Sequence, residues 1–194
     1  MFEVDVVMIG QGEFYTSSRG EILCTVLGSC VSVCLFDEHA KIGGLNHYLL
    51  PEPVMESDKI NWNKAKYGVN AIELLINELL SKGAKRENLK AKIFGGAKMF
   101  EPTNESNEIM TVGKENIEFI RKYLKTEKIS IISEDVGGVK ARKIYLDTGS
   151  NHVKLFRIKK SESIKLIESE FRYRKDISEE GKTEKKKDKK ITFF

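Results

Sequence analysis

Cys30 and His47 are the two residues whose types and spacing could perform chemistry together. Cys30 lies at the junction between the Gly28-Ser29 turn and an apolar run that is typical of a buried strand. Backbone N–H groups at such a turn can stabilise an oxyanion while the thiol attacks a carbonyl carbon. A thiol with an ordinary pKa of about 8.5 is only a few per cent thiolate at pH 7 and needs a neighbouring base, for which histidine is the usual residue. These features predict a cysteine nucleophile activated by a histidine.

The spacing allows His47 to reach Cys30. The runs Val31–Phe36 and Ile42–Leu50 predict two strands that are joined through the turn Asp37–Lys41. If these strands pair antiparallel, His47 is carried back beyond the start of the first strand, toward Cys30. The other two histidines lie in that turn and far along the chain. His47 is therefore the candidate base.

Other roles for the cysteines stay open at this point. A cysteine in an apolar strand is usually a small buried hydrophobe, and this is the role expected for Cys24 and Cys34. A metal site formed by the three cysteines and His47 is a second alternative, but the spacing C-x5-C-x3-C matches none of the short paired zinc spacings. The glycine pairs fit neither a Walker A loop nor GxGxxG. We therefore expect no metal and no cofactor.

The hydrophobic pattern predicts an α/β layered domain. Strands are expected at Ile22–Leu27, at the two runs named above, and at 92–94, 129–133, 143–146 and 153–158. Apolar residues at spacings of three and four predict helices over Lys64–Lys82 and about 114–125. Strands that alternate with two helices, many in hairpin-like succession, indicate a mixed sheet covered by helices.

The chain divides into a folded part and a charged extension. We expect one domain over residues 1–160, which is long enough to bury a substantial core. Residues 161–194 are expected to form a short helix at Ser161–Phe171 and then a charged, disordered segment that includes Thr183–Lys190.

Charge and composition exclude several classes of protein. The 194 residues contain 33 Lys and Arg against 29 Asp and Glu, a net charge of +4, and half of this excess lies in residues 175–190. So small an excess does not indicate nucleic-acid binding. No apolar run approaches the ~18 residues of a membrane helix, and the acidic first residues do not resemble a signal peptide. The three cysteines are odd in number and crowded, which favours free thiols in a cytoplasmic protein.

Several motifs together resemble one known family. The run Thr25–Pro51, TVLGSCVSVCLFDEHAKIGGLNHYLLP, is similar to the signature of the chemoreceptor glutamine deamidase family, CheD. The resemblance continues through Ala91–Phe100 (AKIFGGAKMF) and Asp135–Lys143 (DVGGVKARK), and it covers about residues 22–158. The joint occurrence of LGSCV, GG-x-NH and FGGA in this order makes the resemblance specific.

The resemblance implies a reaction and a set of site residues. Members of this family convert selected glutamines of methyl-accepting chemotaxis receptors to glutamate and release ammonia. Their Cys–His pair falls on Cys30 and His47, and the third member falls on Thr25, with Cys24 as the alternative. We expect support for the site, including oxyanion donors, from Gly28, Ser29, Val31 and Asn46.

The resemblance also implies a fold and a second partner. The family fold is a three-layer α/β/β sandwich with a mixed sheet, similar to bacterial toxin deamidases. Its members bind a CheC-type phosphatase, so a non-catalytic docking module that regulates this phosphatase is the alternative function. A thiol protease or a transglutaminase would share the cysteine chemistry. Neither nucleic acid nor direct membrane insertion is expected.

Overall fold

The computed structural model describes residues 6–49, 68–98 and 107–159, together with residues 168, 169 and 172. The first residues of the expected helix Lys64–Lys82 and most of the charged extension lie outside the described residues. The boundary near residue 160 stays a prediction. No helix in the described part is both long enough and apolar enough to cross a membrane.

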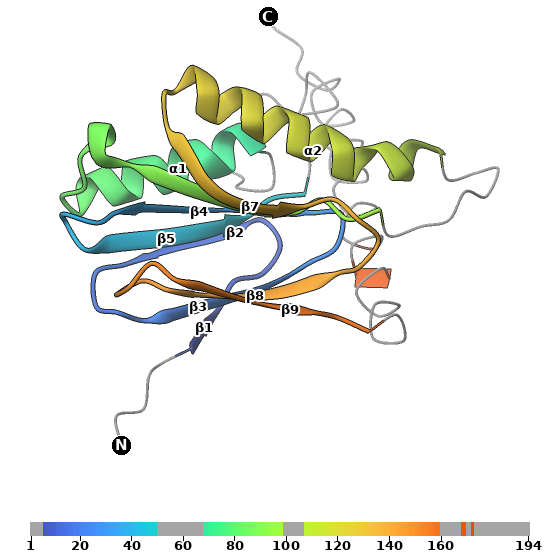
Figure 1. Cartoon of the computed structure of the whole chain (residues 1–194), viewed down its shortest axis with the longest axis horizontal. Coiled ribbons are helices and arrows are strands. Elements are labelled where there is room, and N and C mark those ends of the chain that lie inside the picture. Colours follow the sequence, from blue (N-terminus) through green and yellow to red (C-terminus); the bar gives the residue numbers. More distant parts are fainter. Residues whose placement is uncertain (1–5, 50–67, 99–106, 160–167, 170–171, 173–194) are drawn as a thin grey trace, which may run out of the picture.

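Two β-sheets and a pair of helices form three layers (Figure 1). The four-stranded sheet has the order β1 (Val6–Met8), β3 (Ile22–Leu27), β8 (Arg142–Asp147) and β9 (Val153–Arg157). The five-stranded sheet has the order β2 (Glu13–Ser17), β5 (Ile42–His47), β4 (Val31–Asp37), β6 (Lys90–Gly95) and β7 (Ser130–Val136). Helices α1 (Gly68–Ser81) and α2 (Asn107–Thr126) cover the outer face of the five-stranded sheet (Figure 1). The predicted α/β/β class is confirmed.

Each sheet contains parallel and antiparallel pairs. β1 runs parallel to β3 and β6 runs parallel to β7, whereas the other neighbours are antiparallel. The parallel pair β6 and β7 is connected through α2, the type of crossover that parallel strands need. The prediction of a mixed sheet therefore holds for both layers.

Strand β4 is buried on both faces, as its sequence predicts. Val31, Val33 and Leu35 pack against the helices. Cys30, just before the strand, and Cys34 within it face the other sheet instead. Because successive side chains of a strand point to opposite faces, this alternation directs the thiols into the layer between the two sheets.

The sequence did not predict strands β1 and β2 or the first residues of helix α2. β1 and β2 are short and partly exposed, so neither shows a strong apolar run, and their order comes from pairing with β3 and β5. Helix α2 begins at Asn107, earlier than the expected residue 114. Strand β5 ends at His47 rather than Leu50, although Val31 and Tyr48 still form an isolated bridge.

Candidate active site

The candidate residues Cys30 and His47 share the layer between the two sheets. Val31 is bridged to Tyr48, and Cys34 lies opposite Leu45. This register makes His47 a diagonal neighbour of Cys30 on the same face of the β4–β5 pair. Diagonal neighbours of an antiparallel pair are within reach of long side chains. The chain path expected from the sequence is therefore the one the structure has.

Thr25 approaches His47 from the opposite sheet. Its Oγ1 lies 2.8 Å from His47 Nδ1 and also 2.8 Å from the carbonyl oxygen of Ile9. A hydroxyl has one proton, and the Ile9 carbonyl can only accept, so Thr25 donates to Ile9 and accepts from His47. Nδ1 of a neutral His47 therefore carries the proton, and Nε2 holds the lone pair that can act as a base.

Two main-chain hydrogen bonds hold the groups around the Thr25–His47 pair. The Ile9 N–H donates to the Cys24 carbonyl at 2.8 Å, which holds Ile9 against β3. The Gly12 N–H donates to the His47 carbonyl at 2.8 Å. The connection between β1 and β2 thus orients the imidazole and the hydroxyl that fixes its tautomer. Sequence reasoning missed this connection because β1 and β2 give only a weak pattern.

Cys24 lies on the other face of β3. It pairs with Tyr145 of β8, and adjacent residues of a strand point to opposite faces. Burial raises the pKa of the Cys24 thiol, while the charge of Lys143 lowers it. Of the two candidates for the third position, the residue in contact with His47 is Thr25.

The turn that precedes Cys30 is held by three successive carbonyl groups. The acceptors and donors are Gly28 O with Ala97 N–H at 2.7 Å, Ser29 O with Asn116 Nδ2 at 3.2 Å, and Cys30 O with Gly96 N–H at 2.7 Å. In a trans peptide the N–H points away from the carbonyl of the same peptide unit. These bonds therefore fix the directions of the N–H groups that follow each carbonyl.

Asn116 is a buried polar residue that sequence reasoning did not assign to the site. Its Nδ2 donates to the carbonyl of Leu49 at 3.0 Å as well as to that of Ser29. One side-chain amide thus connects the Gly28-Ser29 turn before β4 to the chain after β5. The Tyr48 hydroxyl donates to the main-chain carbonyl of Asn116 at 2.9 Å. Asn116 falls on the core-facing side of α2 near Ile117 and Ile120, and a polar residue at such a position is the signal that could have identified it.

Tyr48 is a structural neighbour of the site. Burial, and secondarily the nearby Cys30, raise the pKa of Tyr48 well above its usual range. The phenol therefore stays protonated and acts as the donor to Asn116.

Val31 and Asn46 support the strands around the site. The Val31 N–H donates to the Tyr48 carbonyl at 3.1 Å. Asn46 Oδ1 accepts from the Val33 N–H at 2.8 Å, and the side chain thus replaces a main-chain acceptor where the β4–β5 ladder is interrupted. Both interactions stabilise the pairing that carries His47 toward Cys30.

Gly95 permits the close approach of β6 to the turn. Its φ is +113°, and a Cβ atom there would lie 2.2 Å from the carbonyl oxygen of Cys30. A side chain at this position would displace that carbonyl, which the Gly96 N–H holds. Glycine is therefore required by contact as well as by conformation.

The site is closed in this structure. Cys30 and Thr25 are 0% exposed and His47 is 2% exposed. Cys34 is equally buried, and burial raises the pKa of its thiol to about 12, which leaves it protonated at neutral pH. Within the described ranges, no group of three or more His, Cys, Asp or Glu side chains is placed to hold a metal ion.

A family model and several similar proteins all point to the same family. The family model described as CheD chemotactic sensory transduction matches residues 49–157. The "probable chemoreceptor glutamine deamidase CheD" of Laribacter hongkongensis is 38% identical over 91% of this chain and 84% of its own length. "Probable chemoreceptor glutamine deamidase CheD 2" of Shewanella oneidensis is 42% identical over 90% of this chain and 89% of its own length. The "probable chemoreceptor glutamine deamidase CheD" of Herminiimonas arsenicoxydans is 40% identical over 89% of this chain and 83% of its own length. From these matches, the chain belongs to the CheD family.

Proposed function

We propose that this protein deamidates glutamine side chains of chemoreceptors, with Cys30 as the nucleophile and His47 as the base. The names of its relatives support the reaction class. The observation that carries the residue assignment is the Thr25–His47 hydrogen bond, because it fixes the tautomer with a basic Nε2 on the face shared with Cys30. The CheC-type phosphatase partner and the cytoplasmic location stay predictions from the sequence.

The first half of the reaction forms a thioester. His47 Nε2 accepts the proton of the Cys30 thiol, and the thiolate attacks the carboxamide carbon of the glutamine. The oxyanion accepts hydrogen bonds from the N–H groups of Ser29 and Cys30, whose directions are fixed by the bonds to the carbonyls of Gly28 and Ser29. When the intermediate collapses, the C–N bond breaks and His47 returns its proton to the leaving ammonia.

The second half releases glutamate. His47 accepts a proton from water, and the hydroxide attacks the thioester carbon. The C–S bond then breaks, and the thiolate regains its proton from His47. The net reaction consumes one water and yields one carboxylic acid and one ammonia for each glutamine.

Substrate entry requires the residues over the site to move apart, because Cys30 is fully buried here. A glutamine carboxamide stands on two methylene groups, so it can extend into a narrow opening that excludes a main chain. This favours a side-chain amide over a peptide bond as substrate. Mass spectrometry of chemoreceptor cytoplasmic fragments tests the proposal, since each conversion of glutamine to glutamate adds about 1 Da and leaves the chain uncut.

The Thr25 hydroxyl is expected to contribute through the tautomer of His47. Thr25→Val removes the acceptor for Nδ1–H at nearly constant volume, and we expect deamidation to slow about 10²-fold. Thr25→Ser should recover most of this loss, and Cys24→Ala should remain within about twofold of wild type because Cys24 faces away from His47. The measurement is the initial rate of glutamate formation. A Thr25→Val protein as fast as wild type would remove the hydroxyl from the mechanism.

Asn116 is expected to act as a positioning residue for the oxyanion. Its bond to the Ser29 carbonyl orients the peptide whose N–H belongs to Cys30, so Asn116→Ala should slow deamidation about 10²-fold. Alkylation of Cys30 by iodoacetamide forms no oxyanion, so its rate should change less than about threefold.

These two rates distinguish positioning from a structural role. If the Asn116→Ala protein loses alkylation and deamidation in parallel, or unfolds at the assay temperature, Asn116 only maintains the fold. Asn88→Ala is a suitable control, because Asn88 donates to Asp37 in a part-buried contact outside the site.

A further inference from the structure

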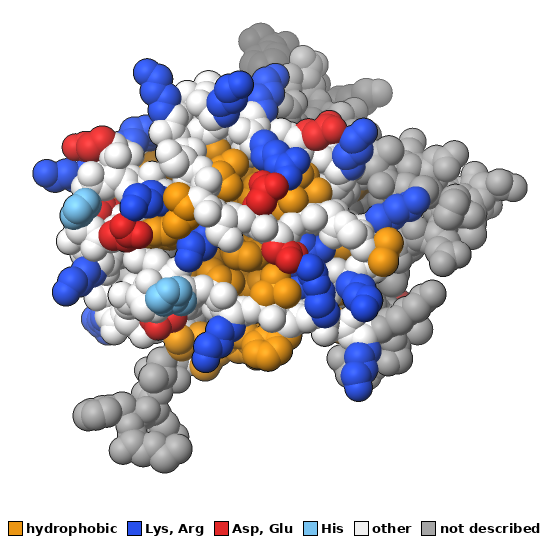
Figure 2. All heavy atoms as spheres, in the orientation of Figure 1, with side chains coloured by type: hydrophobic (Ala, Val, Ile, Leu, Met, Phe, Trp, Pro, Cys, Tyr) orange, Lys and Arg blue, Asp and Glu red, His pale blue; other side chains and the backbone are white. Residues whose placement is uncertain are grey.

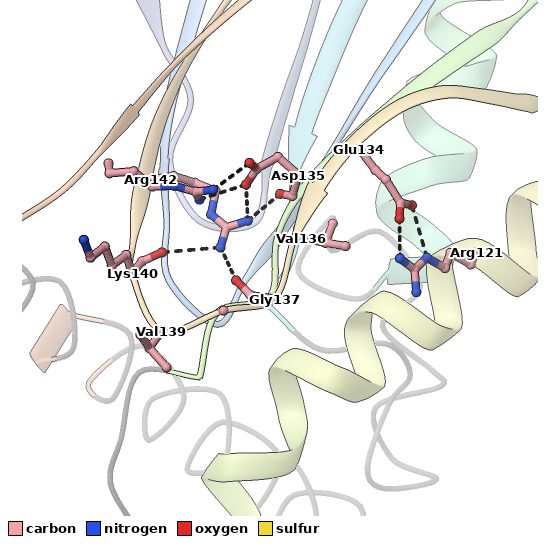
Figure 3. Close-up of a pocket in the computed structure, with 10 residues that line it drawn as sticks. Arg121, Glu134, Asp135, Val136, Gly137, Val139, Lys140 and Arg142 are labelled. Carbon is pink, nitrogen blue, oxygen red and sulfur yellow. Dashed lines mark hydrogen bonds and ion pairs between the residues drawn. The ribbon is translucent and has the colours of Figure 1, made fainter.

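An open pocket lies at the loop between β7 and β8 (Figure 3). It has a volume of about 510 Å³ and is formed by β7, the loop after it, the start of β8, the end of β9 and Arg121 of α2. Figure 2 shows Lys and Arg side chains spread over a face of the molecule, with hydrophobic side chains visible between them. The pocket is distinct from the buried layer that contains Cys30 and His47.

The pocket is connected to Cys30 through two hydrogen bonds of the main chain. The Gly137 N–H donates to the Gly95 carbonyl at 2.9 Å, and the Gly96 N–H donates to the Cys30 carbonyl at 2.7 Å. On the same loop, the Gly138 carbonyl accepts from Lys98 N–H at 2.8 Å. The loop that lines the pocket is thus tied to the turn that carries Cys30.

The lining carries more positive than negative charge. It contains four cationic and two acidic side chains, namely Arg121, Lys140, Arg142, Arg157, Glu134 and Asp135. Glu134 is paired with Arg121, whereas Asp135 alone is shared by two guanidinium groups. Asp135 Oδ1 lies 2.7 Å from Arg142 Nη1, and Oδ2 lies 2.7 Å from Arg157 Nη2. One carboxylate facing two guanidinium groups leaves an excess of positive charge.

Arg142 is built into the wall of the pocket. Its side chain is 1% exposed, and its Nη atoms donate to the carbonyls of Asp135, Gly137 and Lys140 (Figure 3). These bonds hold the loop in its curved path. Its Nε is buried and has no hydrogen-bond partner among the described residues. A buried donor without an acceptor is costly, and the bonds made by the Nη atoms hold Arg142 in the wall despite this cost.

We infer that this pocket receives a carboxylate side chain of the receptor segment that carries the target glutamine. The inference rests on the proposed function, and it adds a specificity rule: glutamines with an acidic residue nearby are preferred. The Arg157 guanidinium, 46% exposed, supplies the accessible charge, and the buried Arg142 supplies the fixed one. Val139 on the same loop is 74% exposed and offers an apolar contact for the segment.

Two matched receptor fragments test this rule. One carries a single glutamate near the target glutamine, and the other carries alanine there, since a glutamine substitute would itself be a substrate. For the wild-type protein we expect kcat/KM to be about tenfold higher with the glutamate, mainly through KM, and this ratio to shrink as salt is raised.

Arg157→Gln should lower kcat/KM for the glutamate fragment to that for the alanine fragment and leave the latter unchanged. Lys154→Gln is the matched control, because Lys154 is an exposed cation on the same strand that does not line the pocket. Its kcat/KM values for the two fragments should equal those of wild type. Equal kcat/KM for the two fragments in wild type at every glutamate position within two helical turns of the glutamine would overturn the inference.

A binding measurement separates this inference from the proposed function. Fluorescence anisotropy with the Cys30→Ala protein reads the pocket without turnover, and the glutamate fragment should bind about tenfold more tightly than the alanine fragment. If wild type deamidates neither fragment but this binding difference appears and vanishes in Arg157→Gln, the proposed function fails while the pocket assignment stands. If wild type deamidates the fragments but the Cys30→Ala protein binds both fragments equally, the pocket assignment fails while the proposed function stands.

Discussion

Cys30→Ala protein is expected to convert no receptor glutamine at a measurable rate, a loss of at least about 10⁴-fold. The substitution removes the sulfur that forms the thioester, and no other described thiol can replace it. Cys24 lies on the far face of β3, and burial raises the pKa of Cys34 to about 12. The measurement is the mass of the receptor fragment after incubation with each protein.

Cys34→Ala is the matched control for this loss. Cys34 faces the same layer as Cys30 and is also 0% exposed, so the two substitutions remove a buried thiol of equal size. We expect Cys34→Ala to deamidate within about threefold of wild type if it remains folded. The assignment of the nucleophile fails if the two variants have similar rates.

His47→Gln protein is expected to lose deamidation by about 10³-fold or more, because glutamine can replace a hydrogen bond to Thr25 but not a base. Iodoacetamide alkylation of Cys30 should slow as well, and its pH profile should move to higher pH, because a buried thiol without a neighbouring base ionises less readily. His39→Gln, at an exposed position in the β4–β5 turn, should match wild type. An alkylation profile that is the same in wild type and His47→Gln would show that the imidazole does not activate the thiol.

The same alkylation experiment bears on the docking-module alternative. A domain that only binds a phosphatase has no need for a Thr25 hydroxyl that sets the tautomer of a buried histidine. We expect Cys30 to react faster than Cys34, because opening of the site exposes Cys30 beside His47, whereas burial raises the pKa of the Cys34 thiol to about 12. Equal, slow alkylation of the two thiols would favour the docking module.

The sequence predicts best what depends on neighbours along the chain. The two apolar runs and the turn between them place His47 beside Cys30, since a hairpin with a short turn has few possible registers. Helix α1 and strands β3, β4 and β8 were also predictable from local patterns. The weak strand β1 was not, because it is ordered by pairing with β3, which is distant from it in sequence.

The parts of the site that join separate layers required either the resemblance or the structure. Thr25 belongs to the other sheet, so no spacing rule links it to His47, and only the family motif suggested it. Asn116 reaches the Cys30 turn from α2, 87 positions away in sequence. The carbonyl contacts that orient the turn are likewise long-range.

The most direct test of the account is to incubate a chemoreceptor cytoplasmic fragment with the wild-type protein in the presence of hydroxylamine. A thioester at Cys30 partitions between water and hydroxylamine, so the same glutamines should appear as glutamate, about +1 Da, and as hydroxamate, about +16 Da. The Cys30→Ala protein should give neither product. A fragment that wild type leaves unmodified, or that both proteins convert equally, would contradict the account.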